Sequence, residues 1–419
     1  MTKKLELLAP AGSPEKLKYA IQYGADAVYA GIPDFSMRYR INKFTEKSLK
    51  EAVEYVHKYN KKIYVTVNIY AHNIHIKKIE KHLKFLKNLN IDGVIVADPG
   101  IINLIKKHLP KVDIHLSTQA NTTNWQAAKF WYDQGVKRIV LAREITLEDI
   151  TEIKKNVPKL ELEYFVHGAM CMSYSGRCVL SKWMANRSAN LGDCAQPCRW
   201  KYKQVASSRY NVSSMRVEDQ KGEYEIDLEE DSQGTYFFNS KDLNLLNYLD
   251  ELQKAGVVSF KIEGRNKSVY YLTTVVKSYR KVLNAIVQKI PKQKENKITK
   301  EAQKDLGDLM HRGYTTGFLL GNEPEHNFSK SHEDSPYEFV GEIVKSEGNL
   351  VKIVPHNAIY KKDKLEIIAK EKNIPIKIKS ILDENKKEVK SAHGGQDKYY
   401  YLEIDKKNVK PMSLLRKHT

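Results

Sequence analysis

The chain has 419 residues, of which 41% are hydrophobic, so it is long and apolar enough to bury a sizeable core. It contains no run of about 18 apolar residues, and its first residues, MTKKLELLAPAG, lack a long apolar stretch, so we expect neither a membrane span nor a signal peptide. A formal net charge of +19 favours a polyanionic partner such as RNA, although a lysine-rich composition alone can also produce it. We expect a cytoplasmic protein.

Short apolar strands alternate with amphipathic helices in the first part of the chain. Ser13 and Pro14 predict a helix start after the first strand, because serine caps helices and proline suits their first position. A second helix is expected over 46–59. The strands are expected at 5–10, 26–31, 62–68, 93–98, 113–118, 138–144, 162–168 and 257–265. Eight βα units predict an α/β fold, a (β/α)8 TIM-type barrel over residues 1–290, with an open doubly wound sheet as the alternative.

The alternation within the strands favours the barrel. In the strand at 162–168, the apolar Leu162, Tyr164 and Val166 alternate with a second set that includes Glu163 and His167. A strand of an open α/β sheet is covered by helices on both faces and is apolar on both. One polar face instead predicts helices outside and a polar site inside the barrel mouth, with Glu163 and His167 on the same face.

An insertion interrupts the repeat after the seventh strand, over about 169–239. It begins with all the cysteines and continues in a polar and apolar alternation with turn signals, which predicts a small antiparallel excursion. The helix of the seventh unit is expected to start near Ser240. Because the insertion follows a strand directly, it lies at the C-terminal ends of the strands, the face that carries catalytic groups in such barrels.

The pattern changes after the eighth unit. The lysine-rich stretch 288–304 indicates a solvated linker or the edge of a helix. We expect residues 291–336 to form a linker or helical connector. Residues 337–419 contain short strands with Gly, Asn and Asp turns and no helical unit. They predict a small C-terminal antiparallel β-barrel domain.

The four cysteines, Cys171, Cys178, Cys194 and Cys198, have the spacing C-x6-C-x15-C-x3-C. Four thiolates at one point can hold a [4Fe-4S] cluster or zinc, and the irregular spacing slightly favours the cluster. Two disulfides are disfavoured in a reducing cytoplasm. A further alternative makes Cys171 a nucleophile with His167 as its base, which would leave three cysteines unexplained.

Polar residues also gather at the predicted strand ends, which together indicate a ligand site. They are Asn68, Asp98, Gln119, Glu144, His167 and Glu263. His167, Glu163 and Glu263 are candidates for acid–base work, with Lys261 as a further catalytic or carboxylate-binding candidate. Arginine forks suit carboxylate and phosphate groups, so Arg177, Arg199 and Arg265 join Asn68, Gln119 and Glu144 as substrate-binding candidates. The alternative is a hydrogen-bonded barrel interior in which Lys261 and Glu263 form a buried ion pair.

Several long motifs resemble peptidase family U-32, the collagenase-like proteins. They are ELLAPAG at 6–12, GADAVYAG at 24–31, HGAMCMSYSGRC at 167–178, CAQPCRW at 194–200, NSKDL at 239–243, KIEGR at 261–265 and GYTTGF at 313–318. The family was named for proteolysis, and other members are associated with hydroxylation of a tRNA wobble uridine at carbon 5, of a ribosomal RNA cytidine and of the ubiquinone ring. His311 stands where relatives often have Asn.

The resemblance implies the chemistry of the site. The cysteines would ligate a [4Fe-4S] cluster, as in relatives with four-cysteine sites, and prephenate would be a co-substrate. Length and the single C-terminal β domain are similar to the tRNA branch, so we expect hydroxylation of the wobble uridine, with tRNA as partner. A peptidase and a non-catalytic zinc or RNA-binding protein are the alternatives. The sequence has no HExxH zinc-protease motif.

Overall fold

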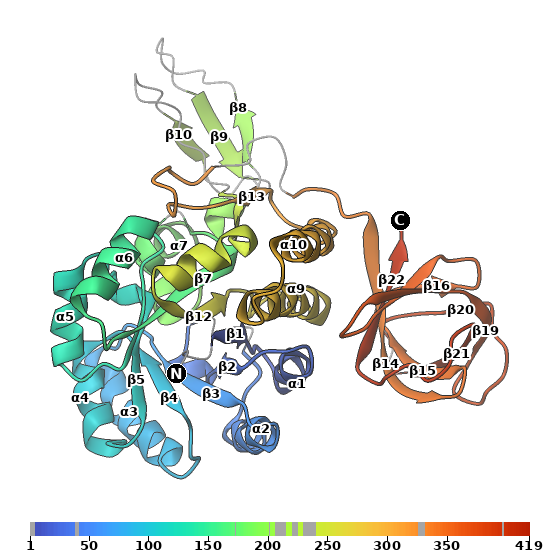
Figure 1. Cartoon of the computed structure of the whole chain (residues 1–419), viewed down its shortest axis with the longest axis horizontal. Helices are drawn as coiled ribbons and strands as arrows, with labels where there is room; N and C mark the ends of the chain where they lie inside the picture. The colour runs from blue at the N-terminus through green and yellow to red at the C-terminus, as the bar shows by residue number, and fades with distance from the viewer. Residues whose placement is uncertain are drawn as a thin grey trace.

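A closed barrel of eight parallel strands forms the larger part of the protein (Figure 1). In the sheet order, β1 to β7 follow one another, and β12 pairs with both β7 and β1, which closes the ring. The strands are β1 (Glu6–Pro10), β2 (Ala27–Ala30), β3 (Lys62–Val67), β4 (Gly93–Val96), β5 (Asp113–Leu116), β6 (Arg138–Val140), β7 (Glu161–Ala169) and β12 (Val257–Ile262). This confirms the predicted barrel and excludes the open sheet.

The computed structural model describes residues 5–37, 42–171, 173–200, 202–205, 215–219, 225–228, 240–325, 332–395 and 398–419. Helices surround the barrel (Figure 1), and the predicted start of the first one is confirmed, because the Ser13 side chain accepts a hydrogen bond from Lys16 N at 3.2 Å. The helices are α1 (Pro14–Gln22), α2 (Glu46–Lys58), α3 (Asn73–Leu86), α4 (Pro99–His108), α5 (Trp125–Asp133), α6 (Leu147–Asn156), α7 (Leu180–Ala185), α8 (Leu249–Lys254), α9 (Val269–Val287) and α10 (Lys292–Gly307).

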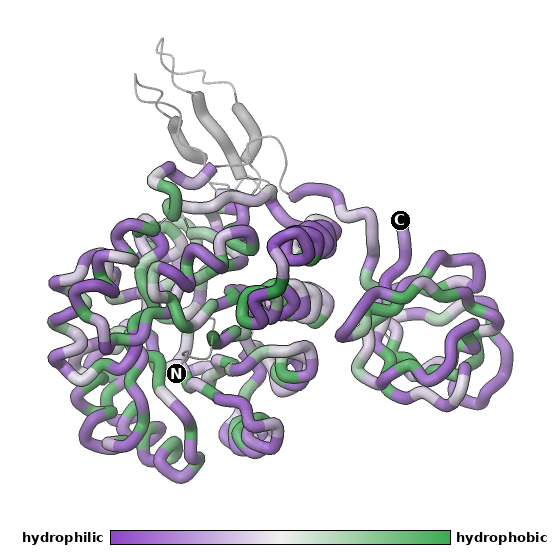
Figure 2. The backbone as a smooth tube through the Cα atoms, viewed as in Figure 1, coloured by the Kyte–Doolittle hydropathy of each residue, from purple (hydrophilic) through white to green (hydrophobic). Residues whose placement is uncertain are grey.

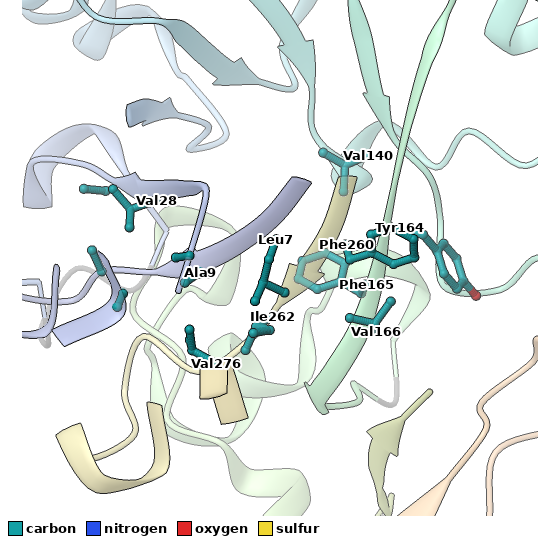
Figure 3. Packing of buried hydrophobic residues seen from close by; sticks show 14 of the residues in the cluster. Leu7, Ala9, Val28, Val140, Tyr164, Phe165, Val166, Phe260, Ile262 and Val276 are labelled. Carbon is teal, nitrogen blue, oxygen red and sulfur yellow. The ribbon is translucent and has the colours of Figure 1, made fainter. Parts of the chain in front are cut away.

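The hydrophobic core lies between the strands and this helical layer. Leu7 of β1, Ile262 of β12 and Val276 of α9 are fully buried in it, and Figure 3 shows their side chains in one neighbourhood. Figure 2 shows α10 as almost wholly hydrophilic, in keeping with the lysine-rich sequence from which it forms. Among the described helices, none is long and apolar enough to cross a membrane.

The chain after the seventh strand departs from the expected helix start. Residues Asp242–Asn244 form a short strand, β11, which runs antiparallel to the end of β7, and helix α8 begins only at Leu249. Two features explain the difference. Strand β7 extends to Ala169, so β11 can pair with its end, and the buried Asp242 forms a salt bridge with Arg312. Strand β13 (Tyr314–Thr315) then pairs parallel to β11.

The described part of the insertion includes a three-stranded antiparallel sheet. Its strands are β8 (Tyr202–Val205), β9 (Met215–Asp219) and β10 (Glu225–Leu228), paired in the order β10-β9-β8. This confirms an antiparallel excursion, although much of the predicted stretch lies outside the described residues.

A curled antiparallel sheet forms the C-terminal region, with strand order β18-β17-β22-β14-β15-β21-β19 and a separate β16-β20 pair (Figure 1). Tyr23 of α1 donates to Ile368 O at 2.8 Å, and the rings of Tyr270 and Phe339 stack with centroids 5.6 Å apart, so the sheet docks on the barrel helices. The strands are β14 (Tyr337–Glu347), β15 (Leu350–Pro355), β16 (Ile359–Tyr360), β17 (Leu365–Ile368), β18 (Asn373–Ile376), β19 (Ile378–Leu382), β20 (Ser391–Ala392), β21 (Tyr400–Ile404) and β22 (Ser413–His418).

Candidate functional site at the barrel mouth

A cavity of about 350 Å³ opens at the C-terminal ends of the strands, and we call it the mouth cavity. All four cysteines contribute to its lining, although they come from a loop that follows only β7. The loop therefore folds back over the barrel. Six other residues predicted from the sequence also line the cavity: Asn68, Gln119, Arg177, Lys261, Glu263 and Arg265.

Hydrogen bonds within the cysteine-bearing loop hold its shape. Cys178 N donates to Asn190 Oδ1 at 3.2 Å, and Ala195 N donates to Ser181 Oγ at 2.8 Å. A salt bridge of 2.9 Å joins Arg187 to Asp193, the residue before Cys194. These bonds fix the backbone on both sides of the thiols, so the positions of the thiols are set by the loop itself.

The four thiols are free and form no disulfide. Burial raises the pKa of Cys198 to about 11; Arg199 opposes this shift, and the other three thiols add to it. Within the described ranges, no three His, Cys, Asp or Glu side chains are grouped so as to hold a single metal ion. The thiols instead surround a cavity, and one thiolate for each iron is the donor set that a [4Fe-4S] cluster takes, so the residues fit that group.

Beneath the cavity, Glu6, Tyr64, Arg138, Glu163 and Ser259 form a bonded cluster that we call the floor network. Arg138 Nη1 lies 2.6 Å from Glu6 Oε1 and 3.2 Å from Glu163 Oε2. The Ser259 hydroxyl lies between the two carboxylates, 2.8 Å from Glu6 and 3.2 Å from Glu163, so they share its single proton, and Tyr64 donates to Glu6. Burial would lower the pKa of Arg138, but Glu6 and Glu163 outweigh it and raise that pKa. Glu163 is fully buried here and does not line the cavity, so the structure places this catalytic candidate in a supporting network.

Lys261 connects the floor network to the mouth cavity. Its Nζ lies 2.6 Å from Glu163 Oε1, so the ion pair predicted with Glu263 is instead made with Glu163. Glu263 lines the cavity and accepts a hydrogen bond from Tyr29 at 3.3 Å. Burial lowers the pKa of Lys261, and Glu163 partly offsets that effect. The ammonium also lies 4.3 Å from the centre of the Tyr29 ring.

His167 does not share the face of Glu163, and that prediction was wrong. The pairing of β7 with β12 slips by one residue between Phe165 and His167, which is a β-bulge and turns His167 to the opposite side. Its Nδ1 lies 3.3 Å from Tyr279 OH in α9, and burial lowers the pKa of His167 to about 3. No histidine is among the residues that line the mouth cavity, so the cysteine–histidine pair expected as one alternative does not form there.

Two other predicted residues support the loop from outside the cavity. Glu144 accepts hydrogen bonds from the backbone N–H of Ser175, at 2.8 Å, and from its hydroxyl. Ser175 has a φ of 31°, an uncommon conformation for a residue with a side chain, so Glu144 helps to hold a strained turn. Arg199 donates to Met170 O at 3.2 Å, which ties the two ends of the cysteine segment together.

Arg143 lines the cavity and was not selected from the sequence, where the neighbouring Glu144 was preferred. Its guanidinium lies 3.8 Å from the centre of the Phe165 ring, and no carboxylate in the described part of the chain forms a salt bridge with it. Both residues follow β6, and only the register of the barrel shows which one faces inward. Arg143, Arg177, Lys261 and Arg265 together give the cavity four cationic side chains against one carboxylate, Glu263. The site therefore suits an anionic ligand.

Comparison with known proteins gives matches over both regions. Residues 12–329 match Peptidase family U32, and residues 335–416 match the Peptidase family U32 C-terminal domain. A Bacillus subtilis relative named tRNA hydroxylation protein P1 is 38% identical over 423 residues, covering 100% of this chain and 96% of its own.

Two further relatives carry other names. The Escherichia coli 23S rRNA 5-hydroxycytidine C2501 synthase is 36% identical over 68% of this chain and 40% of its own length. A Porphyromonas gingivalis protein named collagenase is 32% identical over 75% of this chain and 73% of its own. The matched barrel and C-terminal region, and the identity over the full chain, show that this protein belongs to peptidase family U32.

Proposed function

We propose that this protein is a cytoplasmic RNA-modifying enzyme that hydroxylates carbon 5 of the wobble uridine of tRNA. The observation that carries the proposal is the convergence of four thiols and four cationic side chains on one cavity at the barrel mouth. The full-length similarity to a protein named for tRNA hydroxylation, and the match to a ribosomal RNA hydroxycytidine synthase, support RNA hydroxylation as the reaction class.

Cys171, Cys178, Cys194 and Cys198 would hold a [4Fe-4S] cluster, with zinc as the alternative metal. Replacing a C–H bond of the base by a C–OH bond is a two-electron oxidation, so the reaction needs an external oxidant that accepts two electrons and a source of the oxygen atom. A bound cluster would supply one-electron transfer next to the cavity. The surrounding chain keeps the thiols in place through the Asn190, Ser181 and Arg187 contacts described above.

A prephenate-like dicarboxylate is the co-substrate that we propose for the cavity. Arg143 follows β6, Arg177 lies in the loop after β7, Lys261 lies on β12 and Arg265 lies just after β12, and all four line the cavity. Arginine binds carboxylates through paired N–H donors, so two carboxylates can be held and oriented. Glu263 is the carboxylate in the lining and therefore the acid–base candidate that reaches the ligand.

The positive charge of the chain would hold tRNA through its phosphates. The net charge is +19, and lysines are frequent on α10 and in the C-terminal region. Binding through phosphates releases counterions, so the affinity for tRNA should fall steeply as the salt concentration rises.

Purification without oxygen, followed by iron, sulfide and zinc analysis, tests the cofactor. We expect a brown protein with about four irons per chain, and loss of the iron in Cys194→Ala but not in Ser188→Ala, a change in the same loop outside the cavity lining. Stoichiometric zinc without iron would exclude the cluster.

Nucleoside analysis of tRNA tests the reaction. Cells that lack the gene and any redundant pathway should lose 5-hydroxyuridine derivatives at the wobble position. The wild-type gene should restore them, and the Cys194→Ala gene should not. Unchanged wobble hydroxylation in the deletion strain would count against the assignment.

A peptidase activity, as the family name suggests, is tested on the same proteins. The lining residues of the mouth cavity include no histidine that could serve as a base for Cys171. Proteolysis that survives both Cys171→Ala and Cys194→Ala would separate any such activity from this site.

A further inference from the structure

Two large aromatic side chains stand exposed beside the mouth cavity. Tyr174 is 66% exposed in the turn after β7, and Trp183 is 73% exposed on α7. Large aromatic side chains usually bury most of their surface, so this degree of exposure at two nearby positions requires a reason.

Both aromatic residues lie at the edge of the cavity. Tyr174 stands between Ser173 and Ser175, which line the cavity. Trp183 lies one helical turn after Val179 and Leu180, which also line it, and Trp183 N donates to Val179 O at 2.9 Å. Residues three and four apart share a helix face, so Trp183 continues the lining outward. We call Tyr174 and Trp183 the aromatic rim.

The charge around the aromatic rim favours a nucleic acid over a protein as its partner. Residues 170–200 contain four basic residues and one acidic residue, and that acid, Asp193, is paired with Arg187. Arg177 lies between the two aromatic residues in the sequence, and its side chain lines the cavity. Aromatic platforms interleaved with cations are typical of single-stranded nucleic-acid sites, where bases stack and phosphates pair.

Inside the cavity, Gln119 offers a hydrogen-bond donor. Its Oε1 accepts from Asn68 Nδ2 at 2.9 Å and from Ser117 Oγ at 3.0 Å, which orients the amide. Its buried Nε2 has no hydrogen-bond partner among the described residues, and the side chain lines the cavity. A buried donor without a partner is costly unless a ligand supplies an acceptor, and the carbonyl oxygen of a pyrimidine is one.

We propose that the aromatic rim stacks the bases that flank one unstacked pyrimidine of a single-stranded RNA loop, while that pyrimidine enters the mouth cavity and accepts a hydrogen bond from Gln119. This inference rests on the proposed function in RNA modification and specifies how the RNA is held. It makes recognition depend on unpaired bases, because bases in a duplex stack on one another and cannot reach the rim.

The test measures the binding of a labelled hairpin RNA with an anticodon-like loop, and of a fully paired duplex, at one fixed salt concentration. We expect Trp183→Ala and Tyr174→Ala each to weaken hairpin binding roughly tenfold or more, as for the loss of one stacked base, with duplex binding unchanged. Trp183→Phe and Tyr174→Phe should retain most of the affinity. Phe130→Ala removes an aromatic residue on α5 that is 56% exposed and lies outside the cavity lining, and this change should leave both affinities unaltered.

The tryptophan signal gives an independent readout. Hairpin RNA should quench the fluorescence of wild-type protein, and the quenching should be largely lost in Trp183→Phe even though binding persists. Melting curves check that each variant is folded.

Each outcome bears on the inference separately from the proposed function. Unchanged hairpin affinity in both alanine variants would overturn the proposal that the aromatic rim binds RNA, and it would leave the proposed hydroxylase function untouched. An equal loss of affinity for the hairpin and the duplex would also overturn it, and so would a similar loss of hairpin affinity in Phe130→Ala. Capture of a protein that depends on the aromatic rim, without any effect on RNA binding, would do the same. A wild-type protein that binds no RNA would overturn both the rim and the proposed function.

Discussion

The floor network and the mouth cavity are two polar regions of the same barrel, and they use their charges differently. In the floor network, Arg138 contacts two buried carboxylates, and Ser259 and Tyr64 occupy further lone pairs of those carboxylates. In the mouth cavity, the Arg143 guanidinium lies over the Phe165 ring and forms no salt bridge with a described residue, and Gln119 Nε2 has no partner among the described residues.

The difference separates support from function. A buried charge is tolerated when it is paired and hydrogen-bonded, and the floor network meets that condition with side chains of the protein alone. In the mouth cavity, the Arg143 guanidinium and Gln119 Nε2 do not meet that condition among the described residues, so these two groups are available to a ligand. Composition alone would not distinguish the two regions, because both consist of acids, bases and aromatic residues at strand positions.

The largest effect on stability is expected in the floor network. Glu163→Ala removes the carboxylate that faces both Lys261 and Arg138, and we expect a loss of about 3–5 kcal/mol in the free energy of unfolding. Urea unfolding measures it, with exposed Glu371→Ala as the control for loss of an acid. A loss as small as that of the control would mean that the floor network does not support the barrel.

Arg143→Met, a change in the mouth cavity, should weaken ligand binding strongly and alter the stability of the protein only slightly. The affinity for a prephenate-like dicarboxylate should fall roughly 10- to 100-fold, because a hydrogen bond to a charged group contributes about 1.5–3 kcal/mol. The free energy of unfolding should change by only about 1 kcal/mol, the size of the contact with Phe165. Calorimetric titration and urea unfolding measure the two quantities, and Arg143→Lys tests charge alone. A large loss of stability with unchanged affinity would contradict the assignment of support to the floor network and of ligand binding to the mouth cavity.

The smallest effect is a pH dependence that originates next to the floor network. Burial, reinforced by Arg138 and Lys261, lowers the pKa of His115 well below 6.5. Below about pH 6.5 the unfolded chain therefore binds a proton at this position that the folded protein does not bind. Stability should fall with decreasing pH by about 1.4 kcal/mol per pH unit and should not depend on His115 at higher pH.

The variant His115→Phe isolates this contribution. Its ring can keep the edge contact with Tyr64, and Nδ1 of His115 has no hydrogen-bond partner among the described residues. Urea unfolding at pH 7 and pH 5.5 should show a smaller difference between the two pH values in His115→Phe than in wild type. Arg143→Met should keep the wild-type difference, and equal pH slopes in wild type and His115→Phe would contradict the prediction.

The barrel, the position of the cysteines after the seventh strand and the change to short strands near the C-terminus could all be predicted from the sequence. These features follow from local signals: the period of the apolar residues, the Ser13 cap with Pro14, and turn residues. The family was also recognisable from contiguous motifs such as those at 167–178 and 194–200. Six of the ten predicted site residues outside the cysteines reach the mouth cavity, because strand ends of a barrel meet at one face.

Which side chains face the cavity depends on contacts between distant parts of the chain. The bulge before His167 breaks the two-residue alternation, so a rule that assumes an unbroken strand assigned that ring to the wrong side. The partner of Lys261 is Glu163 from another strand, and the short strand at Asp242 depends on Arg312, which lies far away in the sequence. Arg143 and Glu144 are adjacent and both charged. Only the closed barrel shows that Arg143 lines the cavity and that Glu144 supports the loop through Ser175. Such long-range pairings set orientation, and local sequence patterns do not contain them.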